Sequence, residues 1–373
     1  MPKLGDITGV WNTIRELNVT EIREAAEQPF TIALVGDAAT RTVVARALYG
    51  TPGRFPAAAT PRETLLQYDL PLGRERYGGL SESSLLLLAV DGREPLPSGF
   101  DSTLDKLSML LAPTIIVCVG AARLPSGASG TPNVAAIPVV SIGEDETGVS
   151  SATLMQEIVE RLTEDHRVAA ARRLPGLREA TARALIADTS FSNATYALTS
   201  ALPELVPLLN IPLNAADLLV LTKNQALMVY RLALAFGAPA DFQAQMREIM
   251  PVIGSGFMWR QMARQLIGLI PGFGLVPKVA VAYAGTYTTG HAALVWYSRG
   301  EVLSKGALGR LYRQALHLGR SRAAELRARR KNTPAEPTQP ADPYVGETRR
   351  LDAARGIRRF LLRRRDRPAP PEE

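Results

Sequence analysis

One segment of the chain, Phe30 to Gly50, has the outline of a phosphate-binding P-loop without its defining residues. An apolar run leads into Gly36, and a polar loop and a helical pattern follow. A working P-loop has the spacing GxxxxGK[ST], in which backbone N–H groups surround the phosphates and the Lys contacts them. Here Arg41 replaces the Lys and Thr42 follows it, but the loop is one residue short and Asp37 adds a negative charge. We therefore interpret Gly36, Arg41 and Thr42 as a degenerate nucleotide site.

The other nucleotide-binding motifs, checked in the order in which a GTPase carries them, also fail. A GTPase needs Asp-x-x-Gly after its next strand, and the segment from Asp69 to Gly73 is one residue too long. Guanine recognition needs Asn-Lys-x-Asp, and Gly120 to Arg123 contains no carboxylate. This pattern favours a nucleotide-binding fold kept as a scaffold. Weak binding of GTP through the degenerate loop is the alternative, and no other cofactor is expected.

Neither a metal site nor a catalytic nucleophile is indicated. The three histidines, His166, His291 and His317, are too far apart in sequence for a helical metal pair, and Cys118 is the single cysteine. One cysteine cannot form an intramolecular disulfide, which fits a reducing compartment. The first residues lack a basic stretch followed by an apolar core, so we expect no signal peptide.

The apolar pattern predicts an α/β domain over residues 29–165, preceded by an amphipathic lead-in helix within residues 1–28. Near-continuous apolar strands alternating with helices are typical of a P-loop GTPase-like parallel sheet covered on both faces. The strands are expected at Thr31–Val35, Leu65–Leu70, Ser84–Val90, Thr114–Val119 and Ile137–Ile142.

Beyond this domain we expect an all-α domain over residues 166–331, and a Pro-rich linker with a basic amphipathic tail over residues 332–373. Charge is divided unevenly between the two halves. Residues 1–165 hold 13 Lys and Arg against 21 Asp and Glu, whereas residues 166–373 hold 30 against 15. The basic half is therefore expected to meet an anionic surface: a membrane, nucleic acid or its own acidic half.

Two segments are candidates for membrane contact. Residues 279–298 lack charged side chains and carry Trp296, which suits either a bilayer-inserted helix or a buried helical core. In the tail, one helical face carries apolar residues surrounded by arginines, which is typical of helices on anionic membranes. The tail residues proposed for this contact are Ile357, Phe360, Leu361, Arg358 and Arg359. A solvated tail is the plain alternative, and nucleic acid is a less favoured partner because aromatic residues for stacking are scarce.

The helical region resembles the YcjF-like family, bacterial proteins of unknown function whose helical domain often follows a GTPase domain. The resemblance covers about residues 170–300 and rests on the segments 211–237, 266–274 and 284–300. The matching positions are Asp217, Asn224, Gln225, Met228, Pro271, Gly274, Thr286 and Gly290. The resemblance implies an α-helical, often membrane-associated domain with no assigned reaction.

Together these features predict a non-catalytic pseudo-GTPase scaffold on the cytoplasmic side of the membrane, peripheral or integral, with an unidentified protein partner. A divergent GTPase that uses Arg41 in place of the P-loop Lys is the first alternative. Nucleic-acid binding through the Arg-rich tail is the second.

Overall fold

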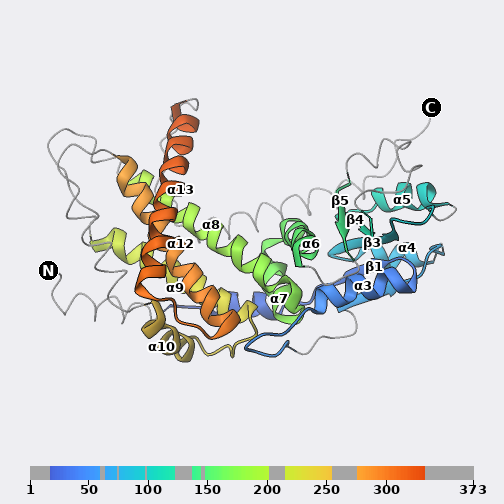
Figure 1. Ribbon diagram of the computed structural model, residues 1–373, viewed down its shortest axis with the longest axis horizontal. Coiled ribbons are helices and arrows are strands. Elements are labelled where there is room, and N and C mark those ends of the chain that lie inside the picture. The colour runs from blue at the N-terminus through green and yellow to red at the C-terminus, as the bar shows by residue number, and fades with distance from the viewer. Residues whose placement is uncertain are drawn as a thin grey trace, which may run out of the picture.

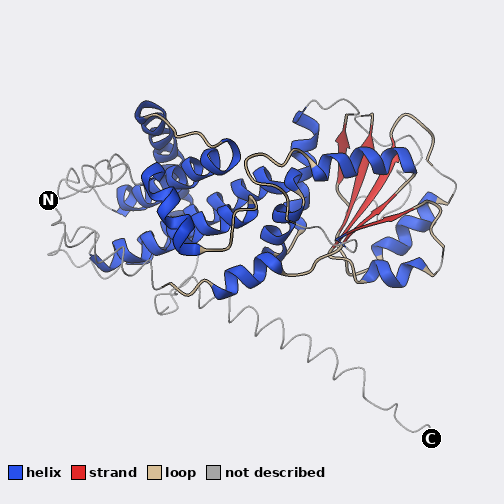
Figure 2. Ribbon diagram, turned by 90° about the horizontal axis from the view of Figure 1, so that it is seen from below, coloured by secondary structure: helices blue, strands red, loops and turns tan. Residues whose placement is uncertain are grey.

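The computed structural model describes residues 17–58, 64–73, 75–96, 99–121, 137–143, 148–200, 215–253 and 275–331. Figure 1 shows a parallel sheet at one end of the molecule and a group of long helices at the other. The view in Figure 2 shows the same division between strands and helices. An α/β region followed by a helical region was predicted from the sequence, and this coarse arrangement is confirmed.

Five strands form the sheet in the order β2-β1-β3-β4-β5, with every neighbouring pair parallel. They are β1 (Ile32–Val35), β2 (Leu65–Tyr68), β3 (Leu85–Asp91), β4 (Thr114–Val119) and β5 (Val139–Ile142). Each predicted strand is present, with small differences at its ends. Strand β2 ends at Tyr68 because β1 turns away at Gly36, whose N–H donates the last ladder bond to the Tyr68 carbonyl at 3.0 Å. Strand β5 begins after Pro138, which has no N–H to donate.

Helices cover both faces of the sheet, as expected for parallel strands with near-continuous apolar sequence. One face is covered by α3 (Ala38–Tyr49) and α6 (Gly148–Arg161), and the other by α4 (Arg76–Ser81) and α5 (Phe100–Ser108). Successive side chains of a strand point to opposite faces. Ile32 and Leu34 accordingly join the first layer, and Ala33 and Val35 join the second.

The helical region is built around α12 (Leu275–Arg299), which packs against α8 and α13 along most of its length and also contacts α9 and α10. The surrounding elements are α7 (Glu164–Arg173), the short 3-10 helix η4 (Pro175–Leu177), α8 (Arg178–Ser200), α9 (Ala215–Ala235), α10 (Phe242–Ile253) and α13 (Lys305–Lys331). The pair α12 and α13 approach closely at Gly319, where a Cβ atom would lie 2.9 Å from the Cα of Ala280. Only glycine fits such a backbone approach.

The uncharged segment 279–298, for which bilayer insertion and a buried helical core were both open, forms most of α12 and is largely buried within the protein. Within the parts of the chain that the structure describes, no helix has both the length and the apolar character needed to span a membrane.

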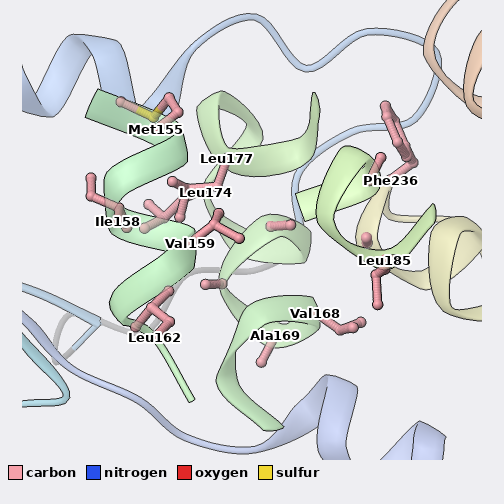
Figure 3. Packing of buried hydrophobic residues seen from close by; sticks show 14 of the residues in the cluster. Met155, Ile158, Val159, Leu162, Val168, Ala169, Leu174, Leu177, Leu185 and Phe236 are labelled. Atoms are coloured by element: carbon pink, nitrogen blue, oxygen red, sulfur yellow. The ribbon is translucent and has the colours of Figure 1, made fainter. Parts of the chain in front are cut away.

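One hydrophobic core joins the sheet to the helices. Its residues run from Ile32 and Leu34 on the sheet, through α6 and α7, to Leu232 on α9 and Tyr297 on α12. Figure 3 shows the middle of this core, where Ile158, Leu162 and their neighbours on α6 face Leu174, Leu177 and residues of α7. The α/β and helical regions therefore share an interior, although the sequence boundary predicted at 165/166 separates their secondary structure.

The lead-in helix is present as α2 (Thr20–Glu27), which packs against α7 and α9 rather than on the sheet. The lead-in helix was predicted within residues 1–28, and residues 17–19 of that range are not helical. The Asn18 side chain explains this boundary, because its Oδ1 accepts a hydrogen bond from the Thr20 N–H at 3.0 Å. Such local bonds compete with helix formation. Residues 1–16 lie outside the described residues.

Candidate functional site

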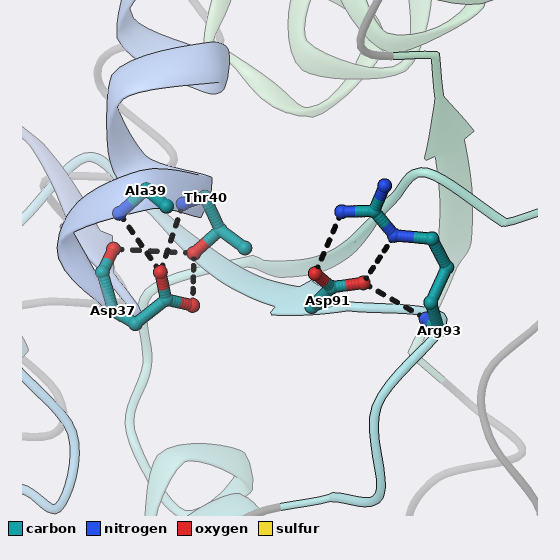
Figure 4. A network of polar contacts seen from close by, with 5 residues as sticks. All are labelled: Asp37, Ala39, Thr40, Asp91 and Arg93. Carbon is teal, nitrogen blue, oxygen red and sulfur yellow. Dashed lines mark hydrogen bonds and ion pairs between the residues drawn. The ribbon is translucent and has the colours of Figure 1, made fainter.

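The strand order creates a topological switch point between β1 and β3. The strand that follows β1 in the chain, β2, lies on one side of this pair, and the strand that follows β3, β4, lies on the other side. In open parallel sheets, ligands bind outside the carboxyl ends of the strands at such a point. Gly36 follows β1 there, and Asp91 ends the neighbouring strand β3. Figure 4 shows Asp91 on the same side of the sheet as Asp37, the residue after Gly36. A Cβ atom on Gly36 would lie 2.6 Å from the Ala89 carbonyl oxygen, so glycine is needed for this close approach of the loop to β3. The loop after Gly36, predicted from the sequence as a degenerate P-loop, therefore lies at the usual ligand position of an open parallel sheet.

Asp37 is the N-cap of α3, and its carboxylate takes the helix N–H groups that a bound phosphate would use. Its Oδ1 accepts hydrogen bonds from the backbone N–H of Ala39 at 2.8 Å and of Thr40 at 3.0 Å. The Thr40 hydroxyl donates to Oδ2 at 2.7 Å (Figure 4). Partial burial raises the pKa of Asp37, but the hydrogen bonds from Thr40 and Ala39 outweigh it and leave this pKa below its ordinary value. The carboxylate is thus an internal anion at the N-terminus of α3.

Arg41, at the position of the P-loop Lys, forms an ion pair with Asp69 just beyond β2. Its Nη2 lies 2.6 Å from Oδ1 of Asp69. The arginine side chain is 12% exposed and the aspartate side chain 80% exposed. Within the described residues, the buried Nε of Arg41 has no hydrogen-bond partner. The one cation of the loop is therefore already engaged by a carboxylate of this chain.

The Thr42 side chain is hydrogen-bonded to the backbone of its own helix. Its hydroxyl donates to the Ala38 carbonyl, four residues earlier in α3, at 2.7 Å. In a working P-loop the corresponding hydroxyl would contact Mg²⁺. The three residues predicted for the degenerate site are adjacent in space, but each polar side chain among them is bonded within the protein.

Asp91, at the end of β3, is also bonded locally. Arg93 donates to its carboxylate from the backbone N–H at 2.9 Å, from Nε at 3.1 Å and from Nη2 at 2.9 Å (Figure 4). The hydrogen bonds from the Arg93 side chain and backbone lower the pKa of Asp91. Asp91 therefore holds the turn that follows β3 through its bonds to Arg93. Arg93 was not singled out from the sequence, since an Arg two residues after a strand carries no distinctive signal.

The loop between α3 and β2, residues 50–58, is held by the helical region through Arg178. This arginine is 3% exposed. It donates to the carbonyls of Pro52, Phe55 at 2.8 Å and Pro56 at 3.0 Å. Burial and then the neighbouring Arg172 lower the pKa of Arg178 to about 10. This role was not predicted from the sequence, because the loop and the arginine are more than a hundred residues apart.

Trp296, predicted as a membrane contact, lies against the same loop. Its indole N–H donates to Oε1 of Glu248 at 3.2 Å, and the Arg54 guanidinium lies 4.2 Å from its ring centroid. Arg54 also pairs with Glu248 at 2.8 Å. Trp296 is partly buried in this three-residue cluster, which joins α12, α10 and the loop. The tail residues predicted for membrane contact, 357–361, lie outside the described residues.

A buried polar network links three helices of the bundle. The Asn193 amide nitrogen on α8 donates to the Thr286 hydroxyl on α12 at 2.8 Å. The Asn224 amide nitrogen on α9 donates to Oδ1 of Asn193, also at 2.8 Å, and Gln225 donates to Thr286 at 3.2 Å. Three of these four residues, Asn224, Gln225 and Thr286, are among the positions that carry the family resemblance. Their role in this protein is to satisfy one another inside the core.

The histidines remain apart, and no cluster of three or more His, Cys, Asp or Glu side chains suited to a metal ion occurs among the described residues. His291 lies on α12 beside Tyr287, with ring centroids 4.3 Å apart. Burial lowers the pKa of His291 to about 4, and the nearby Arg183 adds to the effect. Burial raises the pKa of Cys118, which lies inside β4.

The sheet order and the site geometry define a doubly wound α/β protein whose ligand position is filled by its own side chains. No protein-family model matches the chain, and no curated protein sequence matches it either.

Proposed function

We propose that the chain is a non-catalytic pseudo-GTPase scaffold with a YcjF-like helical domain, attached peripherally to the cytoplasmic side of a membrane. The observation that carries the first part is the Asp37 carboxylate at the N-terminus of α3. The membrane part rests on the basic C-terminal half, on the amphipathic tail and on the family resemblance.

The electrostatics at Asp37 argue against nucleotide binding. A phosphate placed on the same N–H groups would lose the N-cap bonds, which contribute about 1 kcal/mol to stability. It would also stand a few ångströms from the carboxylate, where two like charges repel by about 4 kcal/mol at an effective dielectric constant of 20. Arg41 cannot offset this repulsion without leaving Asp69.

The anchored loop argues for a scaffold. In a GTPase the segment after the P-loop helix rearranges with the γ-phosphate, an order–disorder change that needs few fixed contacts. Here that segment is fastened to the helical region by Arg178 and by Arg54. A fixed surface of this kind suits binding of a protein partner.

Thermal unfolding of the full chain with Mg-GTP, Mg-GDP or Mg-ATP tests the nucleotide part. We expect no stabilisation of the wild type. A ligand present at 100 times its Kd would stabilise the protein by about 2.7 kcal/mol, which is easily detected. Asp37→Asn keeps a capping side chain and removes the charge, so weak stabilisation by phosphate is expected in this variant alone. Asp101→Asn, in the first turn of α5, is the matched control for the charge change.

The divergent-GTPase alternative is favoured by one observation, the position of Gly36 and Arg41 at the switch point of the sheet. Stabilisation of the wild type by GTP, abolished in Arg41→Ala, would establish this alternative and overturn the scaffold proposal.

Fractionation of cells that express the intact chain tests the membrane part. We expect the protein in the membrane fraction and its release by a high-salt wash, because charge holds it there. Retention through salt and carbonate would contradict peripheral attachment, and recovery in the soluble fraction alone would overturn the membrane proposal.

A further inference from the structure

The outward face of α13 carries a line of basic side chains. Arg310, Arg313, His317 and Arg320 are all exposed. With 3.6 residues per turn, these four residues fall within an arc of about 80° and span about 15 Å along the helix. The opposite face, which includes Tyr312, is buried, and its residues pack with Ala284 of α12. The bundle therefore fixes one side of α13 and leaves the basic side outward.

These arginines are not neutralised by the part of the protein that the structure describes. Arg310, Arg313 and Arg320 form no ion pair with a described residue, whereas Arg183 on α8 pairs with Glu179 at 2.6 Å. The sequence 305–324 contains no Asp or Glu. Leu318, which is 42% exposed, lies about 120° around the helix from the middle of this arc and so outside the basic face. The face thus presents fixed positive charge.

We propose that this face of α13 is a contact site for the phosphate headgroups of anionic phospholipids. The inference rests on the membrane part of the proposed function and gives it a surface separate from the C-terminal tail. A straight helix held along one side presents its arginines in a line, which suits a flat anionic surface. Arginine hydrogen-bonds phosphate oxygens in pairs, which matches the phosphate headgroups of such a surface.

Nucleic acid offers the same phosphate chemistry, but the face suits it less. Proteins that follow a single strand place aromatic side chains where bases stack. Tyr312, the one aromatic residue of α13, is 1% exposed and faces the bundle. The basic face therefore carries no Phe, Tyr or Trp on which a base could stack.

The test is co-sedimentation of the full chain with phosphatidylcholine vesicles that contain or lack phosphatidylserine. Each arginine near an anionic surface is worth about a fivefold change in partitioning, so Arg310→Gln, Arg313→Gln and Arg320→Gln together should weaken binding by roughly 100-fold. The same three residues changed to Lys keep the charge and should keep most of the binding. The matched control changes Arg161, Arg167 and Arg183 to Gln, which removes three charges elsewhere on the helices.

Each outcome separates this inference from the proposed function. If the α13 variant binds anionic vesicles as the wild type does, while Arg355→Gln, Arg358→Gln and Arg359→Gln abolish binding, the tail is the contact and this inference is wrong. If the wild type binds no vesicles, the membrane proposal and this inference both fail. If the α13 variant loses salt-sensitive affinity for DNA but keeps vesicle binding, the face is a nucleic-acid site and the inference is overturned.

Discussion

The α/β region and the helical region differ in where their polar side chains lie. The strands β1, β3 and β4 are buried and almost wholly apolar, and the charged groups Asp37, Arg41 and Asp91 stand at their carboxyl edge. The helical region instead buries polar side chains in its interior, Arg178 and Asn193 among them.

This difference follows from where each architecture leaves its backbone groups. A parallel sheet pairs its own N–H and C=O groups along the strands, so its core needs no polar side chains. Helices joined by loops leave carbonyls unpaired at helix ends and in the loops between them. Arg178 and Arg172 supply donors to such carbonyls, including those of Phe55 and Ala238. Removing a polar side chain should therefore cost more in the helical region than at the sheet edge.

The largest effect is expected for Arg178→Met. The methionine fills much of the volume but removes the donor from the carbonyls of Pro52, Phe55 and Pro56, whose hydrogen bonds are partly buried. A hydrogen bond to a charged group contributes about 1.5–3 kcal/mol, and water can reach part of the freed carbonyls, so the free energy of unfolding should fall by about 3–5 kcal/mol. Urea denaturation followed by circular dichroism measures it.

The control for Arg178 is Arg183→Met on the same helix, where the side chain is 64% exposed and pairs only with Glu179. Exposed pairs of this kind contribute less than about 1 kcal/mol, so little change is expected. Equal losses for the two variants would show that the loop carbonyls are not held by Arg178.

Asn193→Leu should cost about 2–3 kcal/mol, because it leaves Asn224 and Thr286 in the core without their shared partner. Thr195→Val, two residues further along α8 and on another side of the helix, removes only a back-bond to the Phe191 carbonyl and serves as the control. Combining Asn193→Leu with Thr286→Val should cost less than the sum of the single changes, since the two residues share one network. Additive losses would mean that the network is not coupled.

The third effect is a pH dependence set by His291. Its pKa is about 4 in the folded protein and about 6.5 in the unfolded chain, so the unfolded state binds the proton first as pH falls. The stability contributed by neutral His291 is complete above pH 6.5 and is lost between about pH 6.5 and 4. Between pH 7.5 and 5 this amounts to about 2 kcal/mol. His291→Gln should remove that part of the pH dependence of the free energy of unfolding. The control is His317→Gln, which removes an exposed histidine and should leave the pH dependence unchanged.

Much of the fold could be predicted from the sequence because its signals are local. Five apolar runs of five to seven residues marked the strands, and the structure has a strand in each of them. The uncharged segment 279–298 could not be assigned, because a helix buried on all sides by protein and one buried in lipid have the same composition. The structure shows that this segment is buried by protein, because α12 is packed against α8, α9, α10 and α13.

The site was predicted only in part, for a different physical reason. The absence of a P-loop Lys and of the second Gly could be read from the sequence, but what replaces the phosphate could not. Asp37 is one residue after Gly36, and its bonds to Ala39 and Thr40 are a common N-cap pattern. Arg41 pairs with Asp69, and Arg178 donates hydrogen bonds to the carbonyls of the loop. Both interactions depend on tertiary contacts, which produce no periodic pattern in the sequence.

The smallest effect, and the sharpest check on the comparison, is expected at Asp37. Asp37→Ala removes the N-cap of α3 and should cost about 1 kcal/mol, whereas Asp37→Asn keeps a capping acceptor and should cost less than half of that. Asp37 has a lowered pKa, so its contribution is present above pH 3.8 and is lost as pH falls below it, outside the range in which His291 acts. Urea denaturation at pH 7.5 measures both variants beside Arg178→Met. If Asp37→Ala proved as damaging as Arg178→Met, the sheet edge would be as essential to the fold as the helical interior. The carboxylate would then be fixed by demands of stability alone, and its position at the phosphate site would say nothing about function.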